Sequence, residues 1–155
     1  MGSGKSVVGA LVAYRAHAPF FDLDFMIEND AGMTIADIFA TRGEAAFRSL
    51  ESKLLPAALQ SGAVVALGGG TPVDEGNWHL IGQRSTSVYL EISFEKIWDR
   101  IARNKSRPLV AGRLRGEVAD LFERRRARYE QADHRVDADR SPDDIATDLL
   151  ALWPG

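Results

Sequence analysis

The residues with the clearest chemistry stand at the start of the chain, in the sequence Met1-Gly2-Ser3-Gly4-Lys5-Ser6. A glycine-rich turn that ends in Gly-Lys-Ser and opens a helix is suited to phosphate. The glycines let backbone N–H groups surround phosphate oxygens, and the helix N-terminus adds partial positive charge. In such a loop Lys5 would reach the β- and γ-phosphates of a nucleotide, and the Ser6 hydroxyl would ligate Mg²⁺. The stretch therefore predicts a phosphate-binding loop.

This phosphate loop is shorter than the full pattern G-x-x-x-x-G-K-[ST], whose first glycine would fall two positions before Met1. The alternative interpretation is a flexible N-terminal Gly/Ser tag. The apolar run Val7-Val8-Gly9-Ala10-Leu11 that follows has the character of a helix and favours the phosphate loop. We expect that Met1 is an internal methionine of a longer loop and that the native protein begins upstream, which the genomic DNA in frame before Met1 would test.

Two acids follow a short aromatic stretch, in the sequence Phe20-Phe21-Asp22-Leu23-Asp24. If these residues form one extended strand, Asp22 and Asp24 project from the same face. Placed beside a phosphate loop, they could then hold a metal ion and orient a hydroxyl group. The alternative is an ordinary pair of turn-forming acids at the end of a strand.

Three successive glycines, Gly68-Gly69-Gly70, follow the continuous apolar run at residues 63–67. Such a run predicts a strand that helices cover on both faces. Ligands of open α/β sheets bind at the carboxyl ends of the strands, and glycines there leave the backbone open to close approach. A bound ligand is therefore a better interpretation than a merely flexible loop.

Many arginines lie between Arg100 and Arg140. Arginine suits planar, bidentate recognition of carboxylate and phosphate groups, although for most of these residues a solvated helix face is the better interpretation. Residues 105–112 combine basic side chains with proline and glycine. This composition is typical of a mobile loop that closes over phosphates.

The composition is that of one globular domain. The chain has 155 residues, of which 45% are hydrophobic and 26% charged, and its net charge of −3 gives no reason to expect binding to nucleic acid or to an anionic membrane. The absence of cysteine excludes disulfides and thiolate metal sites and fits a reducing compartment. Since no apolar run is long enough to span a membrane, we expect a soluble, cytoplasmic protein, and nothing in the pattern demands more than a monomer.

The hydrophobic pattern alternates helices with strands. It predicts helices at residues 6–17, 34–43, 44–60, 77–82, 94–104, 117–132 and from 141 onwards, and strands at 20–24, 63–67, 87–92 and 134–137. Pro56 predicts a kink or break near the residue before it. The alternation predicts an α/β fold with a mostly parallel sheet and right-handed crossovers. The strand that should lead into the phosphate loop is missing.

In their joint order and spacing, these residues resemble the shikimate kinase family over essentially the whole chain. The matching segments are Gly2 to Ser6, Asp22-Leu23-Asp24 with Ile27-Glu28, Ile38-Phe39, Gly43-Glu44, Phe47-Arg48, Glu51, Gly68-Gly69-Gly70, Arg107-Pro108-Leu109, and Arg125 with Tyr129. The resemblance implies a single domain over residues 1–155, with substrate-binding helices at about residues 25–60 and a lid at about residues 105–116.

The fold that this resemblance implies is the P-loop kinase-type, three-layer α/β/α fold, with a parallel sheet of the nucleoside-monophosphate-kinase type. The first strand of that fold is central in the sheet, and it is missing from this chain. Its absence would leave backbone groups on two neighbouring strands without partners and would open the core.

The resemblance also implies an activity, transfer of the γ-phosphoryl group of ATP to the 3-hydroxyl of shikimate in aromatic amino-acid biosynthesis, with Mg²⁺ as cofactor. The implied ATP contacts are Gly2, Ser3, Gly4, Lys5, Ser6, Arg100, Arg107 and Arg140, the metal ligands are Ser6 and Asp22, and the shikimate contacts are Asp24, Arg48, Gly69, Gly70 and Arg125. Three of these residues are implied to be catalytic. Lys5 would hold the phosphates, Asp24 would hydrogen-bond the attacking hydroxyl as a candidate general base, and Arg107 would neutralise charge on the transferring phosphoryl group. Such groups suit phosphoryl transfer, which needs positioning and charge stabilisation more than covalent help.

Two alternatives remain open. Another small-metabolite P-loop kinase, such as a gluconate kinase, would keep Gly4-Lys5-Ser6 but has no need of the two acids, the three glycines, Arg48 and Arg125 together. The other alternative is a truncated, non-catalytic nucleotide-binding remnant. A GTPase is disfavoured, because Asn104-Lys105 lacks the following x-Asp that reads guanine.

Overall fold

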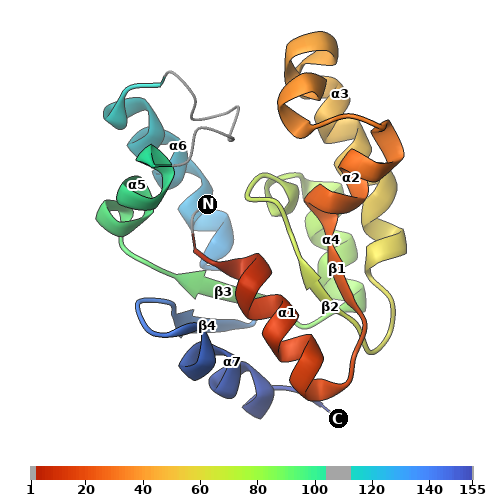
Figure 1. The fold of residues 1–155 in the computed structure, drawn as a ribbon, viewed down its shortest axis with the longest axis vertical. Helices are drawn as coiled ribbons and strands as arrows, with labels where there is room; N and C mark the ends of the chain where they lie inside the picture. The colour runs from red at the N-terminus through yellow and green to blue at the C-terminus, as the bar shows by residue number, and fades with distance from the viewer. Residues whose placement is uncertain (1–2, 104–112, 155) are drawn as a thin grey trace.

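The fold alternates α-helices with short strands, as the hydrophobic pattern predicts. The structure is a computed structural model, and it describes residues 3–103 and 113–154. The helices are α1 (Lys5–Ala16), α2 (Leu23–Ala31), α3 (Ile35–Ala58), α4 (Glu75–Arg84), α5 (Phe94–Ala102), α6 (Arg115–Tyr129) and α7 (Pro142–Ala151), with a short 3-10 helix η1 (Thr71–Val73). The strands are β1 (Phe20–Asp22), β2 (Val64–Ala66), β3 (Val88–Glu91) and β4 (His134–Asp137) (Figure 1). Within the described residues, no helix combines the length and the apolar character that crossing a bilayer requires.

Helix α1 begins directly after the phosphate loop, as predicted. Gly4 precedes it with φ 82°, in the left-handed region that glycine adopts without strain. Val8 and Val12 hold the helix against the core, and both are almost fully buried. The described end of the loop is thus part of the packed fold, which is not the behaviour of a flexible tag.

The strand predicted at residues 20–24 is shorter than expected, and the prediction that Asp22 and Asp24 share one strand face is wrong. β1 ends at Asp22, whose Oδ1 accepts hydrogen bonds from the backbone N–H groups of Asp24 at 3.0 Å and Phe25 at 3.4 Å. Asp22 is therefore the N-cap of α2, and Asp24 lies in the first turn of that helix, where the helix dipole favours a carboxylate. The helix forms here because its Leu23 and Ile27 are fully buried in the core.

The predicted pair of helices at residues 34–60 is confirmed, with its break at Gly43. Thr34 caps the first part by accepting a hydrogen bond from the Asp37 N–H at 3.1 Å. Gly43 takes φ 82° and ψ 172°, the one non-helical conformation inside α3. The break predicted at Pro56 does not occur, since the helix continues to Ala58. Pro56 stands in the last turn, so the one hydrogen bond that its missing N–H removes lies at the end of the helix and does not divide it.

Two other helices differ from the predicted boundaries because side chains cap them earlier than the apolar pattern indicates. Helix α4 starts at Glu75 because Asp74 accepts a hydrogen bond from the Asn77 N–H at 2.9 Å. Helix α6 starts at Arg115, where the Glu117 carboxylate accepts a hydrogen bond from the Leu114 N–H at 2.8 Å. Both are consistent with the preference for acids at helix N-termini.

The strands pair in parallel, as predicted, but they form two separate two-stranded sheets. β1 pairs with β2, with Phe20 opposite Val64, and β3 pairs with β4, with Val88 opposite His134. Each sheet has its own apolar core. Helices α2, α3 and α4 share a core with β1 and β2, whereas α1, α5, α6 and α7 share a core with β3 and β4. Helix α1 also contacts β1 and β2.

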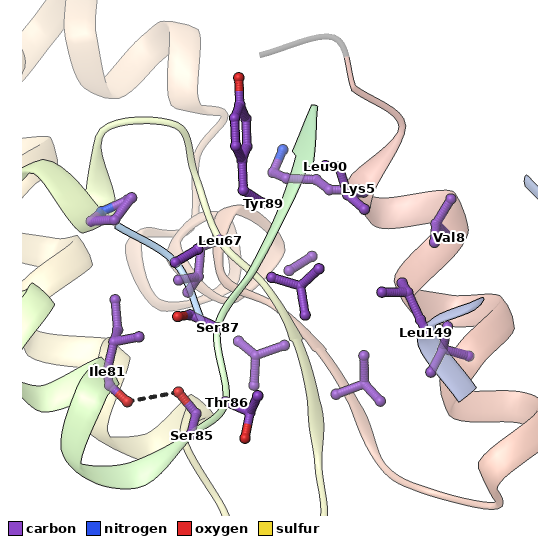
Figure 2. Close-up of a pocket in the computed structure, with 18 of the residues that line it drawn as sticks. Lys5, Val8, Leu67, Ile81, Ser85, Thr86, Ser87, Tyr89, Leu90 and Leu149 are labelled. Carbon is purple, nitrogen blue, oxygen red and sulfur yellow. Dashed lines mark hydrogen bonds between the residues drawn. The ribbon is translucent and has the colours of Figure 1, made fainter. Parts of the chain in front are cut away.

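A cavity of about 660 Å³ lies between the two sheets. Its walls include residues 63–67 around β2 and residues 86–90 around β3, and these two strands form no ladder with each other in the described part of the chain. Figure 2 shows apolar side chains, among them Val8 of α1 and Leu149 of α7, around this space. The cavity therefore lies between β2 and β3, one strand from each sheet.

Candidate active site

The phosphate loop borders a pocket of about 360 Å³ to which distant parts of the chain contribute. Ser3 and Gly4 come from the loop, Arg100 comes from α5, and Arg140 comes from the turn before α7. Backbone N–H groups, a helix N-terminus and two guanidinium groups on one pocket favour an anionic ligand. The structure thus brings together four of the residues that we expect to bind ATP.

Ser6 and Asp22 meet beside the phosphate loop. The Ser6 hydroxyl donates a hydrogen bond to Asp22 Oδ2 at 2.5 Å, while Oδ1 of the same carboxylate caps α2. Hydroxyl and carboxylate oxygens are hard ligands of the kind that Mg²⁺ takes, and Mg²⁺ usually fills its remaining positions with water and nucleotide phosphates. Within residues 3–103 and 113–154, no group of three or more His, Cys, Asp or Glu side chains could by itself hold a metal ion. The pair therefore fits the predicted metal site.

Asp24 approaches the glycine turn that follows β2. A Cβ atom at Gly68 would lie 3.1 Å from Asp24 Oδ1, 2.9 Å from Glu51 Oε1 and 3.3 Å from Thr71 Oγ1. Three polar side chains from α2, α3 and η1 therefore converge on this glycine. They can do so because Gly68 has no side chain of its own.

Arg48 of α3 is held by two carboxylates and lies against the glycine turn. Its Nη1 donates to Glu51 at 2.6 Å and its Nη2 donates to Glu44 at 3.2 Å. The guanidinium covers Gly70, where a Cβ atom would come within 2.5 Å of its Cζ. Burial by itself would lower the pKa of Arg48, but hydrogen bonds and charge attraction from Glu51 and Glu44 raise it above the ordinary value. Arg48 therefore presents a fixed positive charge at this turn.

Arg125 of α6 is related to the same turn through Tyr129. It is only 7% exposed and stands one helical turn before Tyr129. The Tyr129 hydroxyl donates to the Gly69 carbonyl oxygen at 2.5 Å and hydrogen-bonds with Arg125. Burial raises the pKa of Tyr129, while the positive charges of Arg125 and Arg48 act in the opposite direction. Both arginines thus lie near one phenol, beside the glycines at which we expect a ligand.

Three residues of this arrangement, Glu51, Tyr129 and Thr71, were not predicted as site residues, although Glu51 and Tyr129 were among the positions that match the family. The spacing of Glu51 three residues after Arg48, and of Tyr129 four residues after Arg125, could have indicated contacts on one helix face. Thr71 offered no such signal. Its hydroxyl bonds to Glu51, 20 residues earlier in the chain, and only the tertiary structure brings the two together.

Of the other predicted site residues, one lies within the described structure and the rest lie outside it. Lys5 is the first residue of α1, as the phosphate loop requires. Gly2, Arg107 and residues 105–112 of the expected lid lie outside the described residues.

Most of the remaining arginines follow the solvated-surface interpretation. Arg126 pairs with Glu130 at 2.9 Å and Arg135 pairs with Glu91 at 2.6 Å, in each case with both side chains well exposed. Exposed pairs of this kind contribute little to stability. Arg125 departs from this interpretation, since it is buried beside Tyr129.

The phosphate loop, the bonded pair Ser6 and Asp22, and the glycine turn with its two arginines together define the class of protein. A phosphate loop that opens a helix, next to parallel strands, with a second and separate site for an anionic acceptor, is the arrangement of a P-loop kinase for small molecules. The chain belongs to the shikimate kinase family, since the family model described as "Shikimate kinase" matches residues 1–153.

Individual relatives agree with this family. The shikimate kinase of Sulfurihydrogenibium sp. (strain YO3AOP1) is 38% identical over 152 residues, which are 97% of this chain and 91% of the relative. That of Aquifex aeolicus is 35% identical over 156 residues, or 100% of this chain and 92% of the relative. The structure of shikimate kinase from Acinetobacter baumannii in complex with shikimate is 32% identical and has a TM-score of 0.92, over 98% of this chain and 87% of that one. The predicted family and fold class are confirmed.

Proposed function

We propose that this chain transfers the γ-phosphoryl group of ATP to the 3-hydroxyl of shikimate. The observation that carries the proposal is the pair of arginines from two different helices at the glycine turn, with Arg48 against Gly70 and Arg125 beside Tyr129, whose hydroxyl donates to Gly69. Two guanidinium groups near one turn suit a carboxylate, and shikimate is a polyhydroxylated ring with one carboxylate. Membership of the family and the relative solved with shikimate support the same substrate.

On the acceptor side, Arg48 and Arg125 bind the carboxylate, and the backbone of Gly69 and Gly70 contacts the ring. Asp24 accepts a hydrogen bond from the attacking hydroxyl and, as general base, takes its proton as the new O–P bond forms. Its place in the first turn of α2, next to Gly68, supports this role because the carboxylate oxygen reaches the same turn as the two arginines.

On the nucleotide side, Lys5 and the backbone N–H groups of residues 2–6 hold the phosphates. Arg100 and Arg140 lie along the adenine, which their place on the pocket beside the loop supports. Arg107 neutralises charge on the transferring phosphoryl group. Its assignment rests on the resemblance alone, since Arg107 lies outside the described residues.

Ser6 and Asp22 would hold Mg²⁺, with Asp22 acting partly through water. Their contact at 2.5 Å supports this assignment. When bound, the ion neutralises charge on the β- and γ-phosphate oxygens.

We further propose that the protein acts as a monomeric single domain in the cytoplasm, without nucleic-acid or membrane partners. The absence of cysteine fits a reducing compartment. A net charge of −3 gives the molecule no general attraction for polyanions or anionic membranes.

A coupled assay for ADP release tests the proposed reaction. The 155-residue chain is supplied with ATP, Mg²⁺ and either shikimate or gluconate. We expect ADP release that saturates with shikimate and stays at the acceptor-free background with gluconate. Faster turnover with gluconate would assign the chain to another metabolite kinase, and ATP binding without turnover on either acceptor would identify a non-catalytic remnant.

A further inference from the structure

Thr71 makes a buried contact that the proposed reaction does not use directly. Its side chain is fully buried, and its hydroxyl donates to Glu51 Oε1 at 2.7 Å. Glu51 is itself only 1% exposed, and its other oxygen, Oε2, accepts the hydrogen bond from Arg48 Nη1 at 2.6 Å. The three side chains therefore form a chain of hydrogen bonds that ends on the guanidinium over Gly70.

Hydrogen bonds to both the N–H and the carbonyl of Thr71 fix its position. Its N–H donates to the Gly68 carbonyl at 3.2 Å, and its own carbonyl accepts a hydrogen bond from Asn77 Nδ2 at 3.2 Å. Asn77 is in turn tied to the N-cap of α4, since its N–H donates to Asp74. A β-branched side chain on such a fixed backbone has little rotamer freedom, so the hydroxyl points at Glu51 before any substrate arrives.

Glu51 needs this second donor because of its surroundings. Its Oε1 would lie 2.9 Å, and Asp24 Oδ1 3.1 Å, from a Cβ atom at Gly68, so the buried Glu51 carboxylate and the half-buried Asp24 carboxylate face the same place. A buried carboxylate oxygen without a donor is costly. Without the Thr71 hydroxyl, the Glu51 carboxylate would turn to satisfy Oε1 elsewhere, and Oε2 would no longer hold Arg48 in its present orientation.

We propose that Thr71 is a positioning residue for the acceptor's carboxylate, because its hydroxyl fixes Glu51 and thereby holds the Arg48 guanidinium over Gly70. The kinetic consequence of this proposal rests on the proposed function. Its structural part, the restraint of Arg48, holds or fails in the free protein.

Thr71→Val tests the proposal, since valine keeps the shape of threonine and removes the hydroxyl. We expect the KM for shikimate to rise about tenfold, the effect of weakening one charge-assisted contact, while the KM for ATP and kcat stay within about twofold. Thr71→Ser, which keeps the hydroxyl, should restore the KM for shikimate. Thr41→Val is the matched control, because the exposed Thr41 hydroxyl donates to the Asp37 carbonyl and does not contact this network.

A second readout needs no substrate. Rotation of the Arg48 guanidinium, measured by ¹⁵N NMR of the free protein, should be slow in the parent chain and in Thr71→Ser, and faster in Thr71→Val. If the Thr71→Val protein does not fold, a comparison of Thr71→Ser with Thr71→Ala tests the effect of the hydroxyl with smaller side chains.

The outcomes separate the two proposals. If the parent chain shows no shikimate-dependent turnover, the proposed function is overturned. The NMR comparison would still decide the role of Thr71. Unchanged Arg48 rotation in Thr71→Val, or equal rises in both KM values, would overturn the positioning role.

Discussion

Gly68, Gly69 and Gly70 serve the site in three different ways. Gly68 leaves room for side chains that converge from three elements, and Gly69 offers its carbonyl oxygen to Tyr129. Gly70 supports the guanidinium of Arg48. Its φ of −91° is open to any residue, so the absence of a side chain at Gly70 matters for contact and not for backbone strain.

Gly70→Ala is therefore expected to impair substrate binding more than folding. The new Cβ atom would stand 2.5 Å from Arg48 Cζ and 2.7 Å from Nη2, so the guanidinium must move, and a flexible side chain can do so without disturbing the core. We expect the KM for shikimate to rise at least about tenfold, because a charge-assisted contact is lost, with little change in melting temperature.

Gly82→Ala is the matched control for Gly70→Ala. A Cβ atom at Gly82, inside α4, would have no neighbour within 4 Å. Alanine there should raise stability by about 0.5–1 kcal/mol through helix propensity and leave the KM for shikimate unchanged. A Gly70→Ala protein with the parent KM would show that Arg48 does not bind the substrate in the position described above.

At the scale of elements, single side chains at element ends join segments that are far apart in the chain. Asp22 ends β1, caps α2 and accepts a hydrogen bond from Ser6 of α1. In the other sheet, Asp133 joins the segments that precede β3 and β4. Its Oδ2 accepts hydrogen bonds from the Ser87 N–H at 2.8 Å and the Ser87 hydroxyl at 2.7 Å, and so holds the starts of β3 and β4 together.

Asp133→Asn is expected to lower stability at neutral pH and not in acid. Hydrogen bonds from the Ser87 N–H and hydroxyl lower the pKa of Asp133 in the folded protein. A lowered pKa stabilises the fold above the ordinary pKa of an aspartate, about 3.9, and this contribution is lost as the pH falls through the folded pKa. We expect a loss of about 0.5–1 kcal/mol near pH 7, small because the carboxylate is largely exposed.

The measurement is urea unfolding of both proteins across the acid range. The difference in unfolding free energy between the parent chain and Asp133→Asn should shrink as the pH falls and vanish once Asp133 is protonated. A difference that is constant with pH would mean that the carboxylate charge plays no part.

At the scale of the whole molecule, two cores meet around a cavity. Helix α1 contacts β1 and β2 on one side and α7 on the other, so it links the two halves. The cavity of about 660 Å³ beside it runs from Lys5 and Gly68 at the phosphate-loop end to Ser85 and Trp153 at the other. The phosphate loop thus lies at one end of the cavity between β2 and β3.

A strand-forming segment fused ahead of Met1 is expected to stabilise the protein by filling this space. About six residues of valine, isoleucine and leucine followed by glycine match the length of an ordinary strand and could hydrogen-bond with both β2 and β3, as in β-strand addition. We expect the melting temperature, followed by circular dichroism, to rise by several degrees and the further shift on adding ATP to increase. A segment with proline at alternate positions is the control, and an equal rise with both segments would contradict strand insertion.

Features that depend on neighbours in the chain could be predicted from the chain alone. The phosphate loop and α1, the helix break at Gly43, the parallel pairing of strands and the joint pattern of acids, glycines and arginines are of this kind. They follow from residue type and short spacing, because glycine conformations, capping and apolar periodicity are local properties.

Other features were decided only by tertiary packing. Asp22 is a helix cap and not part of a longer strand, because Leu23 and Ile27 are buried as part of α2. Burial in the core thus outweighed the strand pattern of residues 20–24. The bond from Thr71 to Glu51 and the approach of Arg125 to the glycine turn join residues that are distant in sequence. The division into two sheets likewise depends on which strand edges meet in space, and that is a property of the assembled elements rather than of any one segment.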